Sequence, residues 1–145
     1  TFLAFDYGTR RIGVASGSAL AGATPLATLD ARRVDECFAA IGRLIGDWQP
    51  EALVVGVPRH PDGQPHAMTE QAERFARRLE GRFGLAVARV DERYSSVEAQ
   101  ARDGDAQLDA SSAAVILEQY LFERERVERE RADRERAAAG EGALP

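Results

Sequence analysis

Lysine is absent from this chain, and all 19 of its basic residues are arginine. A biased genomic composition is the simplest explanation, although arginine also favours bidentate contacts with phosphate. Cysteine is nearly absent, because Cys37 is the only one. A single cysteine excludes an internal disulfide and a cysteine-based metal cluster, so any bound metal ion must be held by oxygen or histidine.

Long apolar runs are also missing. No window approaches the ~20 apolar residues needed to cross a bilayer, and no basic stretch leads into a signal-like segment. We therefore expect a cytoplasmic protein with no membrane partner. The 145 residues, of which 44% are apolar, are enough for one domain with a genuine core.

Acidic residues outnumber basic ones. The net charge of -5 and the pI of about 5.1 weaken the expectation of nucleic-acid binding. Acidic residues that bind divalent cations would have their charge neutralised, however. The net charge of the metal-free chain would then underestimate its attraction for nucleic acid. The acidic balance therefore does not exclude a nucleic-acid substrate.

Short apolar runs and helical periodicities alternate along the chain. Val34, Phe38 and Ile41 lie four and three residues apart, which is typical of the apolar face of a helix. Pro25 favours a sheet edge for its strand, and Gly84 stands where a C-terminal cap would end a helix. Strands are predicted at 2–5, 12–16, 24–29, 52–57 and 85–90, and helices at 34–48, 68–83 and 110–121, with a short helix from Ser95. This order predicts an α/β fold with a mixed sheet and helices on its faces.

The chain divides by composition near residue 122. Residues 1–122 are predicted to form the folded domain, and residues 123–145 a charged helical extension with a flexible tail. Pairs such as Glu125 with Arg129 and Glu130 with Arg134 are spaced to stabilise that helix, which we expect to fray near Gly140. A solvated helix is favoured over an arginine-rich arm for nucleic acid.

Three carboxylates stand at the ends of predicted elements, where side chains converge in open sheets. Asp6 follows the first strand, Glu92 follows the fifth with Asp91 beside it, and Asp109 begins the last helix. Each also has a structural alternative: Asp6 in a turn, Glu92 in an ion pair, and Asp109 as an N-cap. Together they form a set that suits Mg²⁺ or Mn²⁺, and two such ions can drive phosphodiester hydrolysis.

Four sequence blocks around these acids occur in a fixed order. They are Asp6-Tyr7-Gly8 with Arg11-Ile12-Gly13-Val14-Ala15, Val55-Gly56-Val57-Pro58, Asp91-Glu92-Arg93-Tyr94-Ser95-Ser96, and Asp109 followed by Ile116-Leu117-Glu118-Gln119-Tyr120-Leu121. In this combination the chain resembles the YqgF/RuvX family. The resemblance implies a ribonuclease-H-like five-stranded sheet of order 3-2-1-4-5, related to the RuvC Holliday-junction resolvases.

The resemblance also implies a function. It suggests a metal-dependent nuclease, a hydrolase that trims the 5′ end of pre-16S ribosomal RNA in ribosome biogenesis, with resolution of branched DNA as the alternative. Ribosomal assembly factors are then further partners, while the oligomeric state stays open. By matching position, the residues that would bind Mg²⁺ or Mn²⁺ and act in catalysis are Asp6, Glu92 and Asp109.

Charge and placement suggest which residues contact phosphate. The candidates are Arg10, Arg11, Arg93, Ser95 and Ser96. Many relatives carry a longer, lysine-bearing stretch before the final aspartate, whereas residues 102–108 here are short and acidic, so a substrate contact is expected to be lost.

The sheet order raises a geometric difficulty for Glu92. The strand beside the first one ends in Gly56-Val57-Pro58, without an acid, so Glu92 stands one strand further out. Neighbouring strands are ~4.8 Å apart, which predicts about 10 Å between the backbones at Asp6 and Glu92. We therefore expect metal to bind weakly in the free protein.

Two other interpretations stay open. Asp6-Tyr7-Gly8-Thr9 also resembles the first phosphate motif of actin and the sugar kinases, although such proteins need two lobes. A non-catalytic RNA- or protein-binding module would suit the acidic pI. His60 and His66 are six apart and are expected to be exposed loop residues, with a general-base role as the alternative.

Overall fold

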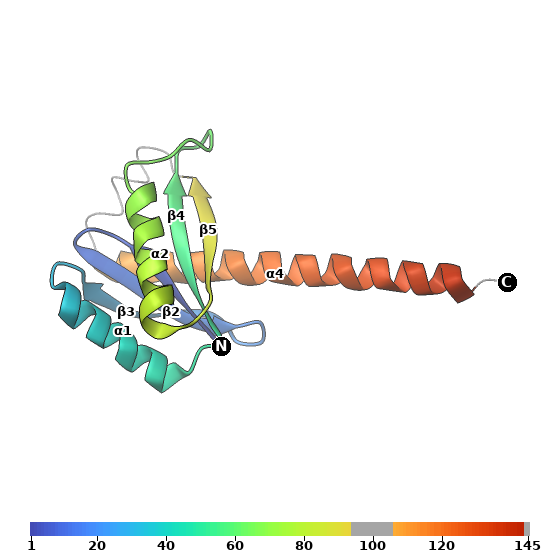
Figure 1. Cartoon of the computed structure of the whole chain (residues 1–145), viewed down its shortest axis with the longest axis horizontal. Coiled ribbons are helices and arrows are strands. Elements are labelled where there is room, and N and C mark those ends of the chain that lie inside the picture. The colour runs from blue at the N-terminus through green and yellow to red at the C-terminus, as the bar shows by residue number, and fades with distance from the viewer. Residues whose placement is uncertain (94–105, 144–145) are drawn as a thin grey trace.

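Five strands and three helices make up the part of the chain that the structure describes (Figure 1). The computed structural model describes the backbone of residues 1–93 and 106–143 and the side chains of residues 1–92 and 110–140. The elements are β1 (Phe2–Tyr7), β2 (Arg11–Ser18), β3 (Gly22–Asp30), α1 (Val34–Trp48), β4 (Ala52–Arg59), α2 (Thr69–Phe83), β5 (Val87–Arg93) and α4 (Ala106–Ala143).

The strands form one mixed sheet of order β3-β2-β1-β4-β5, which confirms the predicted topology. Short links make β1, β2 and β3 antiparallel neighbours. Helices α1 and α2 are crossover connections, and β4 therefore runs parallel to β1 and to β5. Pro25 lies on the edge strand β3, as predicted.

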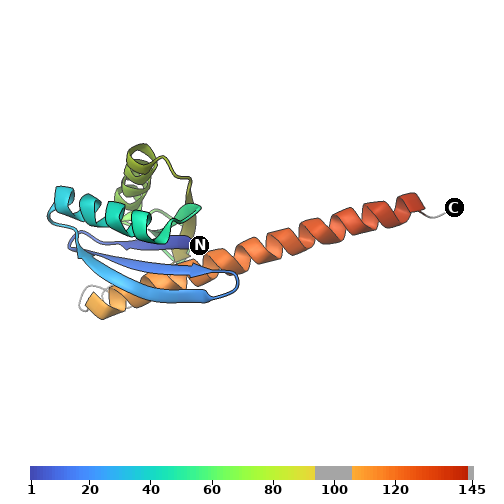
Figure 2. The same cartoon turned by 90° about the horizontal axis from the view of Figure 1, so that it is seen from below.

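The two faces of the sheet bury different sets of side chains. Leu3 and Phe5 belong to the larger core under α1 and α2, whereas Phe2 and Ala4 belong to a smaller core under α4. Figure 2 shows α4 on one face of the sheet and α1 and α2 on the other. Because successive residues of a strand point to opposite faces, the position of a residue in β1 decides which helix layer it meets.

Local backbone chemistry ends both crossover helices. Gln49 follows α1 with a φ of 47°, and its N–H donates to the carbonyl of Ile45 at 2.8 Å. Gly84 follows α2 with a φ of 67°, and its N–H donates to the carbonyl of Glu80 at 3.0 Å. The predicted cap at Gly84 is confirmed, since glycine adopts this left-handed conformation without a steric penalty.

The structure corrects two element boundaries that bear on the site. Strand β5 begins at Val87 and runs to Arg93, so Glu92 lies inside the strand instead of after it. Parallel pairing with Pro58 and Arg59 of β4 extends the ladder beyond the apolar run. Helix α4 begins at Ala106, which rules out Asp109 as its N-cap. The short helix predicted from Ser95 lies outside the described residues.

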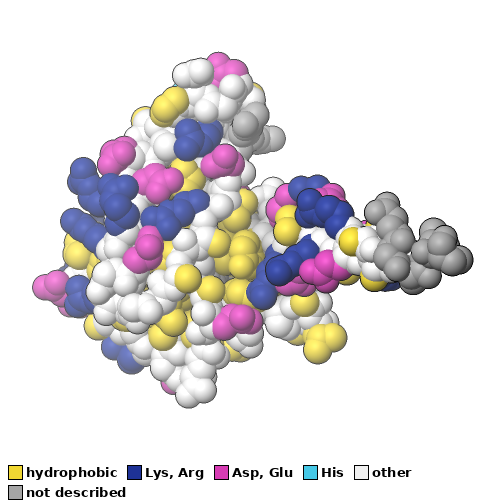
Figure 3. All heavy atoms as spheres, turned by 45° about the vertical axis from the view of Figure 1, so that its right-hand side comes forward, with side chains coloured by type: hydrophobic (Ala, Val, Ile, Leu, Met, Phe, Trp, Pro, Cys, Tyr) yellow, Lys and Arg dark blue, Asp and Glu magenta, His cyan; other side chains and the backbone are white. Residues whose placement is uncertain are grey.

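Helix α4 continues without a break past Phe122 to Ala143, through the glycine where we predicted fraying. Arginine and acidic side chains alternate along this extension (Figure 3). The predicted pair of Arg129 with Glu125 is present at 3.1 Å, whereas Glu130 pairs with Arg126 at 2.9 Å. The domain boundary at residue 122 stays a prediction. None of the helices in the described ranges is both long enough and apolar enough to cross a membrane.

Phe5 offers a direct test of the larger core. Its side chain is fully buried, with its ring centroid 5.8 Å from that of Phe75. We expect Phe5→Ala to lower the free energy of unfolding by about 3–5 kcal/mol, because it removes buried surface and leaves a cavity. Leu20→Ala is the control, since Leu20 is fully exposed and its loss should change little. Urea unfolding of both variants measures the difference, and equal stabilities would contradict the assigned core.

Candidate functional site

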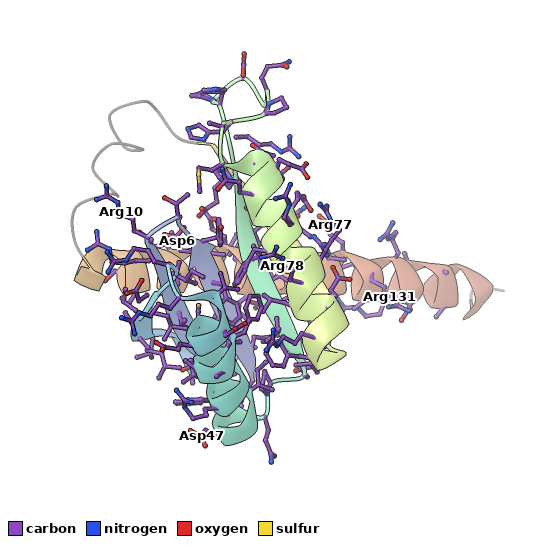
Figure 4. All side chains as sticks on the ribbon, turned by 60° about the vertical axis from the view of Figure 1, so that its left-hand side comes forward. Asp6, Arg10, Asp47, Arg77, Arg78 and Arg131 are labelled. Carbon is purple, nitrogen blue, oxygen red and sulfur yellow. The ribbon has the colours of Figure 1, made fainter. Side chains whose placement is uncertain are left out.

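Asp6 lies near the carboxyl end of β1, in the centre of the sheet. It shares the strand parity of Phe2 and Ala4, which places it on the α4 face. Its side chain is half-buried. Figure 4 shows Asp6 and Arg10 at the same end of the sheet, and Figures 1 and 2 both place the first turns of α4 at that end.

Glu92 also projects to the α4 face, because it is two residues beyond Val90, which packs against the core under α4. It is a buried carboxylate, with only 6% of its surface exposed. Its Oε2 atom lies 2.9 Å from the point that a Cβ atom on Gly56 would occupy. The Glu92 carboxylate therefore reaches from β5 over the neighbouring strand β4.

Gly56 provides the space for this approach. The parallel pairing of β1 with β4 ends at Phe5 and Val55, and Asp6 and Gly56 are the next residues along the two strands. Because Gly56 has no side chain, Glu92 extends over β4 in the direction of Asp6. The strand order confirms that β4 separates the two acids, and the Glu92 side chain spans part of that separation.

The same glycine sets the position of α4. A Cβ on Gly56 would lie 2.5 Å from Cδ1 and 3.0 Å from Cγ1 of Ile116, which is fully buried. Asp109 precedes Ile116 by seven residues, a spacing that puts both backbone positions on one side of the helix, about two turns apart. The side chain of Asp109 lies outside the described residues.

Two predicted phosphate contacts lie beside Asp6. Arg10 is exposed on the turn between β1 and β2, and Arg11 is half-buried at the start of β2. Together with Arg32 they line a hollow of about 400 Å³. Arg32 forms an ion pair with Asp30 at 3.0 Å, and this hydrogen-bonded guanidinium lowers the pKa of Asp30 to about 2. Asp30 is thus ionised at neutral pH and is committed to Arg32.

The remaining predicted contacts fall largely beyond the described part of the chain. Arg93 ends β5, where its backbone pairs with Arg59, but its side chain is not described. Ser95 and Ser96 lie outside the described residues altogether.

The loop after β4 contains features that sequence reasoning missed. His66 is half-buried, and its Nδ1 accepts a hydrogen bond from the Met68 N–H at 3.1 Å, so the expectation of an exposed side chain is wrong for this histidine. Thr69 accepts a hydrogen bond from the His66 N–H and donates one to the Pro58 carbonyl, which fixes the loop to the end of β4. The only sequence signal was the Pro- and Gly-rich composition of the loop.

The donors at this end of the sheet suit a hard cation. Asp6 and Glu92 present carboxylate oxygens, which Mg²⁺ and Mn²⁺ prefer, on one face of the sheet. Among the described side chains no three His, Cys, Asp or Glu residues gather around one metal position. The side chain of Asp109 is not among those described, so the structure describes two of the three predicted carboxylates.

Comparison with known families and curated proteins gives one consistent result. Residues 1–123 match the model of the family RuvX, described as Holliday junction resolvase. A protein of Paraburkholderia phymatum named "Putative pre-16S rRNA nuclease" is 55% identical over 127 residues, covering 83% of this chain and 84% of its own. A protein of the same name from Burkholderia vietnamiensis is 53% identical over 133 residues, covering 85% of this chain and 89% of its own.

Solved structures show the fold. Thermus thermophilus RuvC superposes with a TM-score of 0.53 at 15% identity, over 85% of this chain and 95% of that one. The same protein in complex with a Holliday junction substrate gives a TM-score of 0.53 at 14% identity, over 85% and 94% of the two chains. The sheet order and these superpositions together confirm the RuvC-like, ribonuclease-H-like fold.

Gly56→Ala tests the role of the missing side chain. The added methyl group would collide with Ile116 and crowd Glu92, so we expect the free energy of unfolding to fall by about 1–3 kcal/mol. In an Ile116→Val background, which removes the Cδ1 atom, the cost of Gly56→Ala should be smaller. Urea unfolding of the two single variants and the double variant gives this coupling.

Gly46→Ala is the matched control for this substitution. A Cβ at Gly46, inside α1, would have no atom within 4 Å. Alanine there should raise stability by about 0.5–1 kcal/mol, because it favours the helix. If Gly56→Ala were as harmless as Gly46→Ala, the close packing over β4 would be wrong.

Proposed function

The chain belongs to the RuvX family, and from this premise we propose that it is a nuclease that processes the 5′ end of pre-16S rRNA. The observation that carries the proposal is the approach of the buried Glu92 carboxylate over Gly56, on the same sheet face as Asp6. The relatives' printed name supports the RNA substrate. Family membership favours this activity over the kinase-like alternative.

We infer that Asp6, Glu92 and Asp109 would hold Mg²⁺ or Mn²⁺. When bound, such ions activate water and stabilise the leaving oxygen in phosphodiester hydrolysis. Packing around Gly56 and Ile116 restricts the side chain of Glu92, so this ligand is oriented before substrate arrives. Asp6 is held by the central strand of the sheet.

Arg10 and Arg11 would bind the phosphates next to the scissile bond. Arg10 stands on the turn that follows β1 and Arg11 begins β2, a few residues from Asp6. Guanidinium groups make bidentate, charge-assisted hydrogen bonds with phosphate oxygens, which fix the substrate backbone relative to the carboxylates. Contacts from Arg93, Ser95 and Ser96 remain part of the same proposal.

The proposed substrate implies the setting of the reaction. Processing of pre-16S rRNA takes place during ribosome biogenesis, so we place the protein in the cytoplasm with ribosomal assembly factors as partners. A four-way DNA junction is the second candidate substrate, because the family description is Holliday junction resolvase.

Asp6→Asn and Glu92→Gln test the proposed site. Each substitution removes a carboxylate charge with little change in shape. We expect metal-dependent cleavage of a pre-16S 5′ fragment to fall by about 100-fold or more, a loss of the size seen when one transition-state contact is removed. The matched control is Asp47→Asn, since Asp47 is exposed near the end of α1 and lies far from Asp6 in Figure 4.

The assay compares the RNA fragment with a four-way DNA junction, each with Mn²⁺ and with EDTA. Equal cleavage by the parent and Asp6→Asn would refute the site. Cleavage of the junction alone would assign the DNA substrate. If the parent cleaved neither substrate, the non-catalytic binding module would be the better interpretation.

Metal binding can also be measured without catalysis. An ion that binds only the folded protein stabilises it, by ~2.7 kcal/mol at a 100-fold excess over its Kd. We expect Mn²⁺ to raise the thermal midpoint of the parent only at high concentration, because β4 separates Asp6 from Glu92. The increase should be smaller in Asp6→Asn and unchanged in Asp47→Asn. An equal shift in all three proteins would put the ion elsewhere.

A further inference from the structure

A second groove lies on the sheet face opposite Asp6, between α1 and α2. Its volume is about 420 Å³, and its floor includes the rings of Tyr7, Phe38 and Phe75. The Tyr7 and Phe75 ring centroids are 5.0 Å apart. Arg74 and Arg78 of α2 form one wall, and both are exposed. The groove thus combines an apolar floor with a basic wall.

The acidic residues of α2 do not neutralise this wall. Glu70 pairs with Arg77 at 3.1 Å, while Glu73 and Glu80 both pair with Arg89 of β5, at 3.2 and 2.5 Å. All three glutamates of α2 have arginine partners other than Arg74 and Arg78. Glu70 itself lines the groove, but Arg77 engages its carboxylate, so the wall keeps a positive charge. Figure 4 shows Arg77 and Arg78 on different sides of the helix.

Arg74 and Arg78 keep their charge available. Among the described residues neither one has an acidic group within ion-pair distance. Arg82 continues the row one turn further, with its guanidinium carbon 5.0 Å from the centre of the Phe38 ring. Positions four apart lie on one side of a helix, so the three arginines form a basic row beside α1.

The groove is close to the proposed catalytic end of the sheet. Tyr7 follows Asp6 directly in β1 and points to the opposite face, into the groove. Ala31 lines the groove, while its neighbour Arg32 lines the hollow that also contains Arg10 and Arg11. A chain bound at Arg10 can therefore continue around the end of the sheet to Arg74.

We propose that this groove binds a single-stranded flank of the RNA substrate, outside the segment that is cleaved. The inference rests on the proposed nuclease function and extends it to a second binding site. Arg74 and Arg78 contact phosphates, and an unstacked base lies against the half-buried ring of Tyr7. A groove of this volume accommodates a nucleotide but not a duplex.

Binding of two labelled RNAs in EDTA tests the site without cleavage. One RNA carries a long single-stranded flank, and the other ends near the cleavage position. We expect Arg74→Gln/Arg78→Gln to bind the long RNA about 10-fold more weakly and to lower its salt slope by about 1.4, since each phosphate contact contributes about 0.7. Affinity for the short RNA should not change. Arg43→Gln is the control, because Arg43 is exposed on α1 but does not line the groove.

The outcomes separate this inference from the proposed activity. If the double variant bound the long RNA as tightly as the parent, the groove would not be an RNA site, whether or not the parent is a nuclease. Weaker binding by the double variant supports the groove even if the parent cleaves no RNA. If neither RNA bound the parent, the groove would not be an RNA site, whereas the cleavage assay with Mn²⁺ would still decide the nuclease activity. A glutamate-rich peptide can be tested in the same way. If the double variant lost affinity for this peptide but bound both RNAs like the parent, the groove would be reassigned to an acidic protein partner.

Discussion

The close approach of α4 to the sheet depends on the absence of a side chain at Gly56. Ile116 occupies the space above that residue, and the Glu92 carboxylate lies beside it. A single position on β4 therefore determines how closely the last helix packs and how far a buried acid extends from the next strand. The stability of the fold and the orientation of the proposed metal ligand rest on the same contact. A substitution there cannot alter one without disturbing the other.

Strand parity divides the molecule into two chemically different faces. Asp6 and Tyr7 are adjacent in β1, yet one lies on the α4 face with the carboxylates and the other contributes to the basic groove under α2. The register is fixed by an antiparallel partner on one side of β1 and a parallel partner on the other. A slip of one residue would exchange the two side chains between the faces, so this pairing specifies the site as well as the core.

Much of the fold follows from local signals in the sequence. Helical spacing predicted α1 and α2, and Gly84 marked the end of α2 correctly. Local signals failed where distant residues decide the structure. Strand β5 extends through charged residues because β4 supplies its partners, and the approach of Glu92 over Gly56 depends on packing between segments far apart in the chain. The sequence predicted that one strand separates Asp6 from Glu92, but it did not predict that the Glu92 side chain reaches over Gly56.

Net charge conceals how the arginines are distributed. Along the extension of α4 they pair with glutamates three or four residues away, and such pairs on an exposed helix contribute little to binding or stability. Around α2 the glutamates are engaged by Arg77 and Arg89, and Arg74 and Arg78 are left facing the groove. An acidic protein can thus present a basic surface, because many of its glutamates are paired with arginines of the same helix or of β5. At the proposed carboxylate site, bound cations would weaken the repulsion of phosphate, whereas the attraction of phosphate to the arginines would not require metal.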